Sequence, residues 1–186
     1  MKTIVSMVFV LVSLLSTSPT WAEPKPFTFG VIADCQYCDA ATSGVRQYRD
    51  SPEKLQAAVA HLNTLKIKFT VHLGDFIDRD WESFDVVAPI YQSLKKPAYY
   101  VLGNHDYSVA DDKKAQVHTK LGLKSRYYNF KVKGWRFVAL DGNDISFHAY
   151  PKGSAEYLGA EKYYSDNTIT SPKWNGAIGE AQLEWL

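Results

Sequence analysis

The sequence predicts a layered α/β fold whose functional site lies where several strands end. Short apolar runs at residues 27–33, 69–73 and 99–102 are rich in β-branched, aromatic and leucine residues, as buried strands are. A cluster of acidic and polar residues follows each run directly. Open α/β sheets build ligand sites at the carboxyl ends of neighbouring strands. We therefore expect the polar clusters to meet at one edge of a sheet.

The first helix is expected to begin at residues 51–53. Ser51 suits the cap position, Pro52 the first turn, and Glu53 the positive end of the helix dipole. A helix placed between two apolar runs supports a layered α/β unit. Apolar residues then recur at helical spacing along one face, at Leu55, Val59, Leu62 and Leu65.

Two more helices are predicted in the middle of the chain. One covers residues 83–94, where apolar residues share a face and Pro89 is expected to bend the axis. The other covers residues 111–120 and ends before Gly122, a residue type suited to a helix stop.

A hairpin and a long loop are predicted next. Residues 126–131 and 135–140 alternate as paired strands do, across a turn at residues 133–134. Residues 141–176 are rich in Gly, Ser, Asn and Tyr and are predicted to form a long loop. Loops of this length are usually functional lids or disordered. The loop at residues 141–176 is therefore interpreted either as a functional lid or as an ordinary surface loop.

The three polar clusters contain the candidate site residues. A single Asp at a strand end is often only a turn or cap residue. The prediction of a metal site therefore depends on the number of clusters and on their order along the chain. Carboxylate and amide oxygens together with one imidazole suit divalent metals such as Mn, Fe or Zn. The clusters hold Asp34 and Gln36, then Asp75 and Asp78, then Asn104, His105 and Asp106.

These clusters resemble the signature of the calcineurin-like metallophosphoesterase superfamily, which reads D-x-H, G-D-x-x-D and G-N-H-D/E in that order. Gln36 stands where most members have His, and a D-x-Q block followed by Tyr37 and Asp39 is similar to one subgroup, the manganese-dependent ADP-ribose/CDP-alcohol diphosphatases. The segments 140–142 and 179–186 also resemble that subgroup. The resemblance implies a four-layer sandwich, with helices flanking two mixed sheets, of which this chain is the N-terminal portion.

The resemblance implies a role for each site residue. Two divalent metal ions are expected, with Mn favoured over Fe or Zn because the neutral amide of Gln36 is a weaker donor than imidazole. His105 is expected to stabilise phosphoryl charge or protonate the leaving oxygen, with Asp106 orienting its imidazole and Asp78 supporting the Asp75 loop. The implied ligands are Asp34 and Gln36 for the first metal, Asp75 as the bridge, and Asn104 for the second metal.

The implied activity is hydrolysis of phosphodiester or pyrophosphate bonds in small nucleotide-type substrates such as ADP-ribose or CDP-alcohols. Nucleic acid is not an expected partner, because 21 Lys and Arg nearly balance 20 Asp and Glu. The oligomeric state stays open.

Two histidine motifs of the superfamily, a lone His and G-H-x-H, have no counterpart in the chain. No His follows Gly, and only His105 follows an apolar strand in the expected manner. The chain is therefore expected to be C-terminally truncated, and a catalytically inactive remnant is the alternative to an enzyme. The five histidines are His61, His72, His105, His118 and His148.

The N-terminus has the pattern of a secretory signal peptide. A basic start, an apolar stretch and small residues before position 22 predict cleavage there and a domain over residues 23–186. The apolar stretch is too short for a spanning helix. We expect a periplasmic or secreted protein that has no membrane association after cleavage.

The two cysteines, Cys35 and Cys38, flank part of the first cluster. In an oxidising compartment they are candidates for a local disulfide, or they remain plain thiols. Thiol–disulfide exchange is a third hypothesis, but it needs a helix N-terminus to lower a thiol pKa, and here a polar loop is expected.

Overall fold

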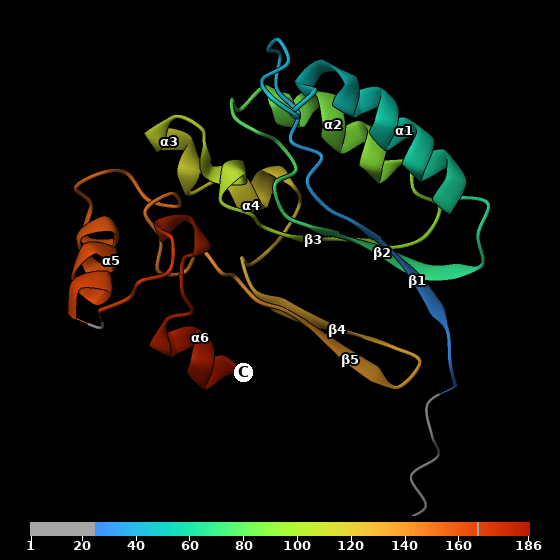
Figure 1. The fold of residues 1–186 in the computed structure, drawn as a ribbon. Coiled ribbons are helices and arrows are strands. Elements are labelled where there is room, and N and C mark those ends of the chain that lie inside the picture. Colours follow the sequence, from blue (N-terminus) through green and yellow to red (C-terminus); the bar gives the residue numbers. More distant parts are fainter. Residues whose placement is uncertain (1–24, 167) are drawn as a thin grey trace, which may run out of the picture.

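A parallel sheet of three strands forms the centre of the fold (Figure 1). The computed structural model describes residues 25–166 and 168–186, so the predicted signal peptide lies outside the described residues. The strands lie in the order β1-β2-β3, which confirms the three predicted runs. Their bounds are β1 (Thr28–Ile32), β2 (Ile67–Leu73) and β3 (Ala98–Val101).

Helices α1 (Ser51–Leu62) and α2 (Ser83–Gln92) cover one face of this sheet (Figure 1). The cap position of α1 is taken by Asp50 and not by Ser51, and no side chain caps it, while Pro52 lies in the first turn as predicted. The apolar face of α1 is shorter than predicted, because Leu65 lies beyond the helix end and is exposed. The core under the helices includes Leu55, Val59, Phe76, Phe84, Val87, Tyr91 and Tyr100.

The opposite face of the sheet meets the predicted hairpin, formed by β4 (Tyr128–Val132) and β5 (Trp135–Ala139). Aromatic rings join the two layers. Phe69 lies 4.9 Å from Phe137, and Tyr99 stacks on Phe130, centroid to centroid, at 3.6 Å. Offset and edge-on ring pairs of this kind stabilise a layer contact beyond the apolar area they bury.

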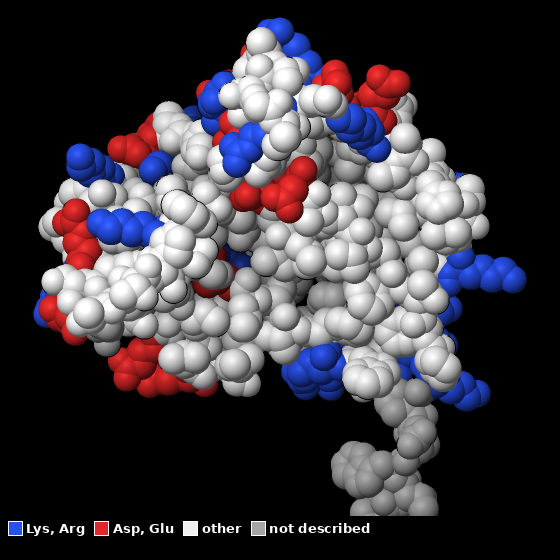
Figure 2. All heavy atoms as spheres, in the orientation of Figure 1, with Lys and Arg blue, Asp and Glu red and all other residues white. Residues whose placement is uncertain are grey.

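This hairpin covers only part of the face. Val31 is 53% exposed and Leu73 is 52% exposed, although both belong to the central strands. Figure 2 shows few charged side chains over the part of the view where β1 and β2 lie, and a hollow between that part and the segment around α5.

The predicted helix over 111–120 is two short helices, α3 (Asp111–Lys114) and α4 (Val117–Lys120). The side-chain amide of Gln116 donates to the carbonyl oxygen of Asp112 at 2.9 Å, four residues earlier. It thereby takes the acceptor that the backbone N–H of a continuous helix would use. The break lets Val117 turn inward, where it is fully buried.

The predicted loop over 141–176 is not irregular throughout, because it contains α5 (Ala155–Asp166) and a 3₁₀ turn, Lys173–Asn175. A Ser154 cap marks the start of α5, with its Oγ accepting from the backbone N–H of Tyr157 at 3.2 Å. The helix has only Ala160 and Tyr164 buried, so its sequence carries no apolar stripe that periodicity would detect. The chain ends with α6 (Glu180–Trp185). Among the described helices, none is both long and apolar enough to cross a membrane.

Candidate functional site

The carboxyl ends of β1, β2 and β3 bring the predicted clusters together. The backbone N–H of Asp34 donates to the carbonyl of Gly74 at 3.2 Å, and that of Gln36 donates to the carbonyl of Asp75 at 2.9 Å. The N–H of His105 donates to Oδ1 of Asp75 at 3.0 Å. Residues about 30 to 40 positions apart in the sequence therefore converge on the Asp75 carboxylate.

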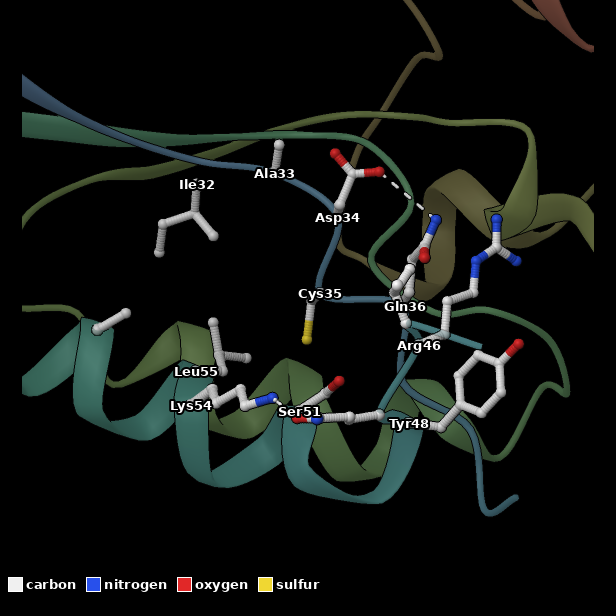
Figure 3. Close-up of a pocket in the computed structure, with 13 residues that line it drawn as sticks. Ile32, Ala33, Asp34, Cys35, Gln36, Arg46, Tyr48, Ser51, Lys54 and Leu55 are labelled. Atoms are coloured by element: carbon white, nitrogen blue, oxygen red, sulfur yellow. Dashed lines mark hydrogen bonds between the residues drawn. The ribbon is translucent and has the colours of Figure 1, made fainter. Parts of the chain in front are cut away.

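The side chain of Gln36 lies between two carboxylates. Its Nε2 donates long hydrogen bonds to Oδ1 of Asp34 at 3.5 Å and to Oδ2 of Asp75 at 3.4 Å; Figure 3 shows the first of these. Two carboxylates that share one donor make a place that favours positive charge. Oxygen donors of this kind suit a hard divalent cation.

The backbone at the site is held in an unusual conformation. Asp34, Gln36 and Asp75 have φ values of 54°, 46° and 52°, in the left-handed region that residues with a Cβ rarely adopt. Such strain costs about 1–3 kcal/mol per residue and clusters where a side chain must be aimed at a ligand. The same three residues were predicted as metal ligands from the sequence.

Gly103 allows the ends of β2 and β3 to approach. A Cβ on Gly103 would lie 2.1 Å from Oδ1 and 2.4 Å from the backbone nitrogen of Asp75. No larger residue fits there without moving the backbone. The glycine before Asn104 is therefore required by a close approach between two site loops.

Asn104 completes the predicted ligand set. It precedes the 3₁₀ turn η2 (His105–Tyr107), and its side chain makes no cap hydrogen bond to that turn. The N–H of the next residue, His105, bonds to the Asp75 carboxylate, which places Asn104 beside the site. Over residues 25–166 and 168–186 no group of three or more His, Cys, Asp and Glu side chains could hold a metal ion. The donors that fit a divalent metal here are two carboxylates and two amides.

Asp78 holds the imidazole of His105. The Nδ1 atom of His105 lies 3.1 Å from the backbone carbonyl of Asp78 and 3.3 Å from its carboxylate Oδ1. Both neighbours are acceptors, so Nδ1 carries the proton, and Nε2 is the ring atom left to face a substrate. Arg46 and Arg79 contact the same carboxylate at 3.2 and 3.4 Å.

Asp106 has a different role from the one predicted. Its Oδ1 accepts from the N–H groups of Phe76 and Ile77 at 2.8 and 3.2 Å, and its Oδ2 accepts from Gly103 at 2.8 Å. The fully buried carboxyl therefore clamps two site loops together, and Asp78 is the group that orients the imidazole. Burial raises the pKa of Asp106 to about 7, against the lowering effect of these backbone donors.

A cavity of about 590 Å³ opens beside Asp34 and Gln36 (Figure 3). It lies between the end of β1 and the first turns of α1, and Lys54 reaches across it to Gln47 at 2.6 Å. The cationic and aromatic side chains of this cavity follow no motif, so sequence patterns do not identify them. They are Arg46, Tyr48 and Lys54.

Both cysteines are free thiols in the structure. Burial raises the pKa of the Cys35 thiol to about 12, and burial also raises the pKa of Cys38. Thiol–disulfide exchange needs the opposite shift, because the thiolate is the nucleophile. The geometry therefore disfavours the exchange hypothesis and agrees with plain thiols.

Two histidines outside the motifs have distinct environments. His72 is fully buried on β2, and among the described residues neither of its ring nitrogens has a hydrogen-bond partner. His148 lies outside the helices and strands, within the loop predicted over residues 141–176. Burial lowers the pKa of its imidazole, and the charges of Lys114 and His105 add to this effect.

Comparison with known proteins agrees with this geometry. A family model described as Calcineurin-like phosphoesterase matches residues 27–185. A protein from Arabidopsis thaliana is 31% identical over 196 residues, which cover 89% of this chain and 63% of that protein. One from Oryza sativa subsp. japonica is 32% identical over 191 residues, with 86% and 59% covered. Both are named manganese-dependent ADP-ribose/CDP-alcohol diphosphatase.

A solved structure also shares the fold. The crystal structure of a dimetal phosphatase from Danio rerio superposes with a TM-score of 0.70 at 24% identity, covering 86% of this chain and 63% of that one. The α/β metallophosphoesterase fold class predicted from the sequence is thereby confirmed. The chain spans less than two thirds of the length of these relatives, as the shares of 63% and 59% show.

Proposed function

The chain belongs to the calcineurin-like phosphoesterase family, and we propose on that basis that it is a divalent-metal-dependent hydrolase of small nucleotide-linked diphosphates. The observation that carries the proposal is the meeting of Asp34, Gln36 and Asp75 at the strand ends, with the backbone of His105 bonded to the Asp75 carboxylate at 3.0 Å. ADP-ribose and CDP-alcohols are the proposed substrates, following the names of the relatives.

Two manganese ions are the proposed cofactors. Asp34 and Gln36 would hold one, Asn104 the other, and Asp75 both. When bound, such ions neutralise phosphoryl charge and activate water for attack. The rare backbone conformation of Asp34, Gln36 and Asp75 supports the assignment, as do the hydrogen bonds by which the Gln36 amide joins the two carboxylates.

His105 is the proposed acid for the leaving oxygen. Its Nδ1 proton is held by Asp78, so the Nε2 atom is the one that can hold or deliver a proton beside the phosphoryl group. Asp106 contributes by fixing the loops that carry Asp75 and His105, and it does not touch the substrate in this scheme.

The cavity beside Asp34 and Gln36 is the proposed binding site for the part of the substrate beyond the reacting phosphoryl group. Its volume of about 590 Å³ falls within the usual size of small-molecule sites. Arg46 and Lys54 line it and supply positive charge for a second phosphate, and the ring of Tyr48 offers an apolar wall. A diphosphate with an organic group on each side matches that combination.

Turnover by the full chain tests the proposal. We expect Mn²⁺-dependent release of AMP from ADP-ribose that stops on addition of a chelator and falls by about 10²-fold or more in Asp75→Asn. Asp80→Asn is the matched control, since Asp80 lies in the same loop, also has a positive φ of 68°, and forms its ion pair among the described residues with Arg79. Release that survives the chelator would contradict a metal-dependent mechanism.

Metal binding without turnover is the second candidate. It is favoured by the proposed ligand set of two carboxylates and two neutral amides, because within the described residues no group of three or more His, Cys, Asp and Glu side chains could hold a metal ion. The same assay separates the candidates when Mn²⁺ binding is followed in parallel by electron paramagnetic resonance. Bound Mn²⁺ with no AMP released from ADP-ribose or CMP released from a CDP-alcohol would support the second.

Export to the periplasm or the medium is also proposed, on the N-terminal pattern alone. N-terminal sequencing of the protein from its host would then begin at residue 23. A start at Met1 would contradict export by cleavage.

A further inference from the structure

Arg46 connects the cavity with the carboxylate that holds His105. It lines the cavity together with Gln36 and Tyr48 (Figure 3). Its Nη1 atom lies 3.2 Å from Oδ1 of Asp78, and the same carboxylate oxygen lies 3.3 Å from Nδ1 of His105. Because Arg46 and the imidazole share one acceptor atom, their two nitrogens are no further apart than the length of two hydrogen bonds.

The carboxylate at this junction is buried, whereas the guanidinium reaches the surface of the cavity. The side chain of Asp78 is 5% exposed and that of Arg46 is 42% exposed. Arg79 contacts the other oxygen of the carboxylate, Oδ2, at 3.4 Å. One carboxylate that is shared among two guanidinium groups and an imidazole neutralises each cation only in part. Arg46 therefore presents positive charge to the cavity from a position that a buried group fixes.

The backbone of Arg46 is also fixed, by a tight turn at residues 43–46. The N–H of Arg46 donates to the carbonyl of Ser43 at 3.0 Å, and the N–H of Ser43 donates to the carbonyl of Arg46 at 3.0 Å. Gly44 has a φ of 58° within this turn. A cation whose backbone and charged end are both held loses little freedom when an anion binds to it.

Lys54, a second cation of the cavity, is held differently. Its Nζ atom bonds to the side chain of Gln47 at 2.6 Å, in an exposed position on the cavity wall. An ammonium group acts as a point charge, whereas a guanidinium offers a planar fork of N–H donors that matches phosphate oxygens. Lys54 is thus suited to attract anions in general, and Arg46 is suited to fix one phosphate at a set distance from His105.

We propose that Arg46 makes the site specific for diphosphates over phosphate monoesters by binding the second phosphate while Asp78 holds it beside His105, an inference that rests on the proposed function. The two phosphorus atoms of a diphosphate share one bridging oxygen, so the second phosphate lies directly beside the one that reacts. Arg46 and His105, both held on one carboxylate oxygen, match such a pair of phosphates. A monoester has no second phosphate for Arg46 to bind. Asp78 is a positioning residue for Arg46 in this scheme.

The binding of two adenine nucleotides to the full chain tests this specificity. α,β-Methylene-ADP carries a diphosphate whose bridge is carbon and is therefore not hydrolysed, whereas AMP carries a single phosphate. With Mn²⁺ present, Arg46→Ala should weaken the binding of α,β-methylene-ADP about tenfold or more, the loss expected for hydrogen bonds to a charged group, and should change the binding of AMP by less than about twofold. Calorimetric titration measures both affinities.

Two further variants control for charge and for the loop. Arg46→Lys should recover only part of the affinity for α,β-methylene-ADP, because it restores the charge and not the planar fork. Arg49→Ala is the matched control, since Arg49 pairs with Asp39 at 2.6 Å on the surface and is not among the residues that line the cavity. It should leave both affinities unchanged.

The ratio of the two affinities distinguishes positioning by Asp78 from a general structural role, which would weaken both nucleotides alike. Asp78→Asn should lower the preference for α,β-methylene-ADP over AMP in the otherwise unaltered chain. It should leave that preference unchanged in Arg46→Ala, where no guanidinium remains to be positioned. If Arg46→Ala leaves the preference as it is in the unaltered chain, the inference is overturned and the proposed function stands. If neither nucleotide binds to the unaltered chain in the presence of Mn²⁺, the proposed function and the inference both fail.

Discussion

The helix-covered face of the parallel sheet and the loops at its carboxyl end differ in what fixes their conformation. Under α1 and α2, large apolar side chains such as Phe84, Val87 and Tyr91 are fully buried. In the loops after β1 and β2, Asp34, Gln36 and Asp75 hold left-handed backbone conformations instead. The first region is stabilised by burial, whereas the second carries strain.

The difference shows how the strained loops persist. Backbone hydrogen bonds from Asp34 and Gln36 join the loop after β1 to the loop after β2. The fully buried carboxyl of Asp106 in turn ties the loop after β2 to the loop after β3 through three backbone N–H groups. Strained residues keep their geometry only when the surrounding structure over-determines it. The packed face is therefore the rigid support that keeps the site residues in their strained conformations.

The largest loss of stability is expected for Gly103→Ala, at the close approach between the loops after β2 and β3. The new Cβ would lie 2.1 Å from Oδ1 and 2.4 Å from the nitrogen of Asp75, so the backbone has to move. We expect the free energy of unfolding to fall by about 4–5 kcal/mol or more, with Mn²⁺ affinity lost. Urea denaturation and Mn²⁺ titration measure the two effects. Gly159→Ala is the control, since nothing lies within 4 Å of its new Cβ, and a loss there as large would contradict the steric argument.

A cavity in the packed face should lower stability and leave the site intact. Phe84 is fully buried under α2, and Phe84→Ala should lower the free energy of unfolding by about 3–4 kcal/mol. The molecules that remain folded should bind Mn²⁺ as before, because Phe84 lies on α2 and is not among the residues that hold the site loops together. Leu158→Ala, at a position 52% exposed, should change stability by less than about 1 kcal/mol. Lost Mn²⁺ affinity in folded Phe84→Ala would show that the two regions are not separable.

The packed face contains one polar exception, His72, which makes stability depend on pH. Burial lowers the pKa of its imidazole to about 3 from an ordinary 6.5. Below pH 6.5 the unfolded chain binds a proton that the folded chain refuses, so stability is full above 6.5 and is lost as the pH falls towards 3. The slope for one group is about 1.4 kcal/mol per pH unit.

Denaturant unfolding at pH 7, 6 and 5 measures this slope. His72→Leu should flatten the profile, whereas His61→Leu, at an exposed residue, should leave it unchanged. If the free energy of unfolding of His72→Leu falls as steeply with pH as that of the unaltered chain, groups other than His72 cause the pH dependence.

The smallest effect on stability, and the sharpest test of stored strain, is expected in Gln36→Gly. Glycine accepts the φ of 46° without strain, so the free energy of unfolding should rise by about 0.5–1 kcal/mol while Mn²⁺ affinity falls. Lys133→Gly is the matched control, because Lys133 has a φ of 52° in the hairpin turn, away from the site. It should gain similar stability with unchanged Mn²⁺ affinity. A loss of stability in Gln36→Gly would mean that its two amide hydrogen bonds outweigh the strain.

Much of the fold follows from local patterns. The strands, the first two helices and the hairpin turn at residues 133–134 were predictable because apolar periodicity and turn residues act over a few positions. Helix α5 was not, because Gly159 and the lack of an apolar stripe hide it, and only the Ser154 cap signals its start. At the division of residues 111–120 into two helices, the side chain of Gln116 bonds to the carbonyl of Asp112 and its backbone N–H to that of Lys113.

By itself, the sequence determined which chemical groups the site contains and the order in which the strands deliver them. Only the tertiary structure decided that Asp78 holds His105 and that Asp106 clamps the loops after β2 and β3. The reason is geometric. The Asp78–His105 contact joins residues 27 positions apart and the Asp106–Phe76 bond joins residues 30 positions apart, and a hydrogen bond depends on shifts of less than 1 Å. Such a shift is set by the packing of whole layers and not by any local pattern.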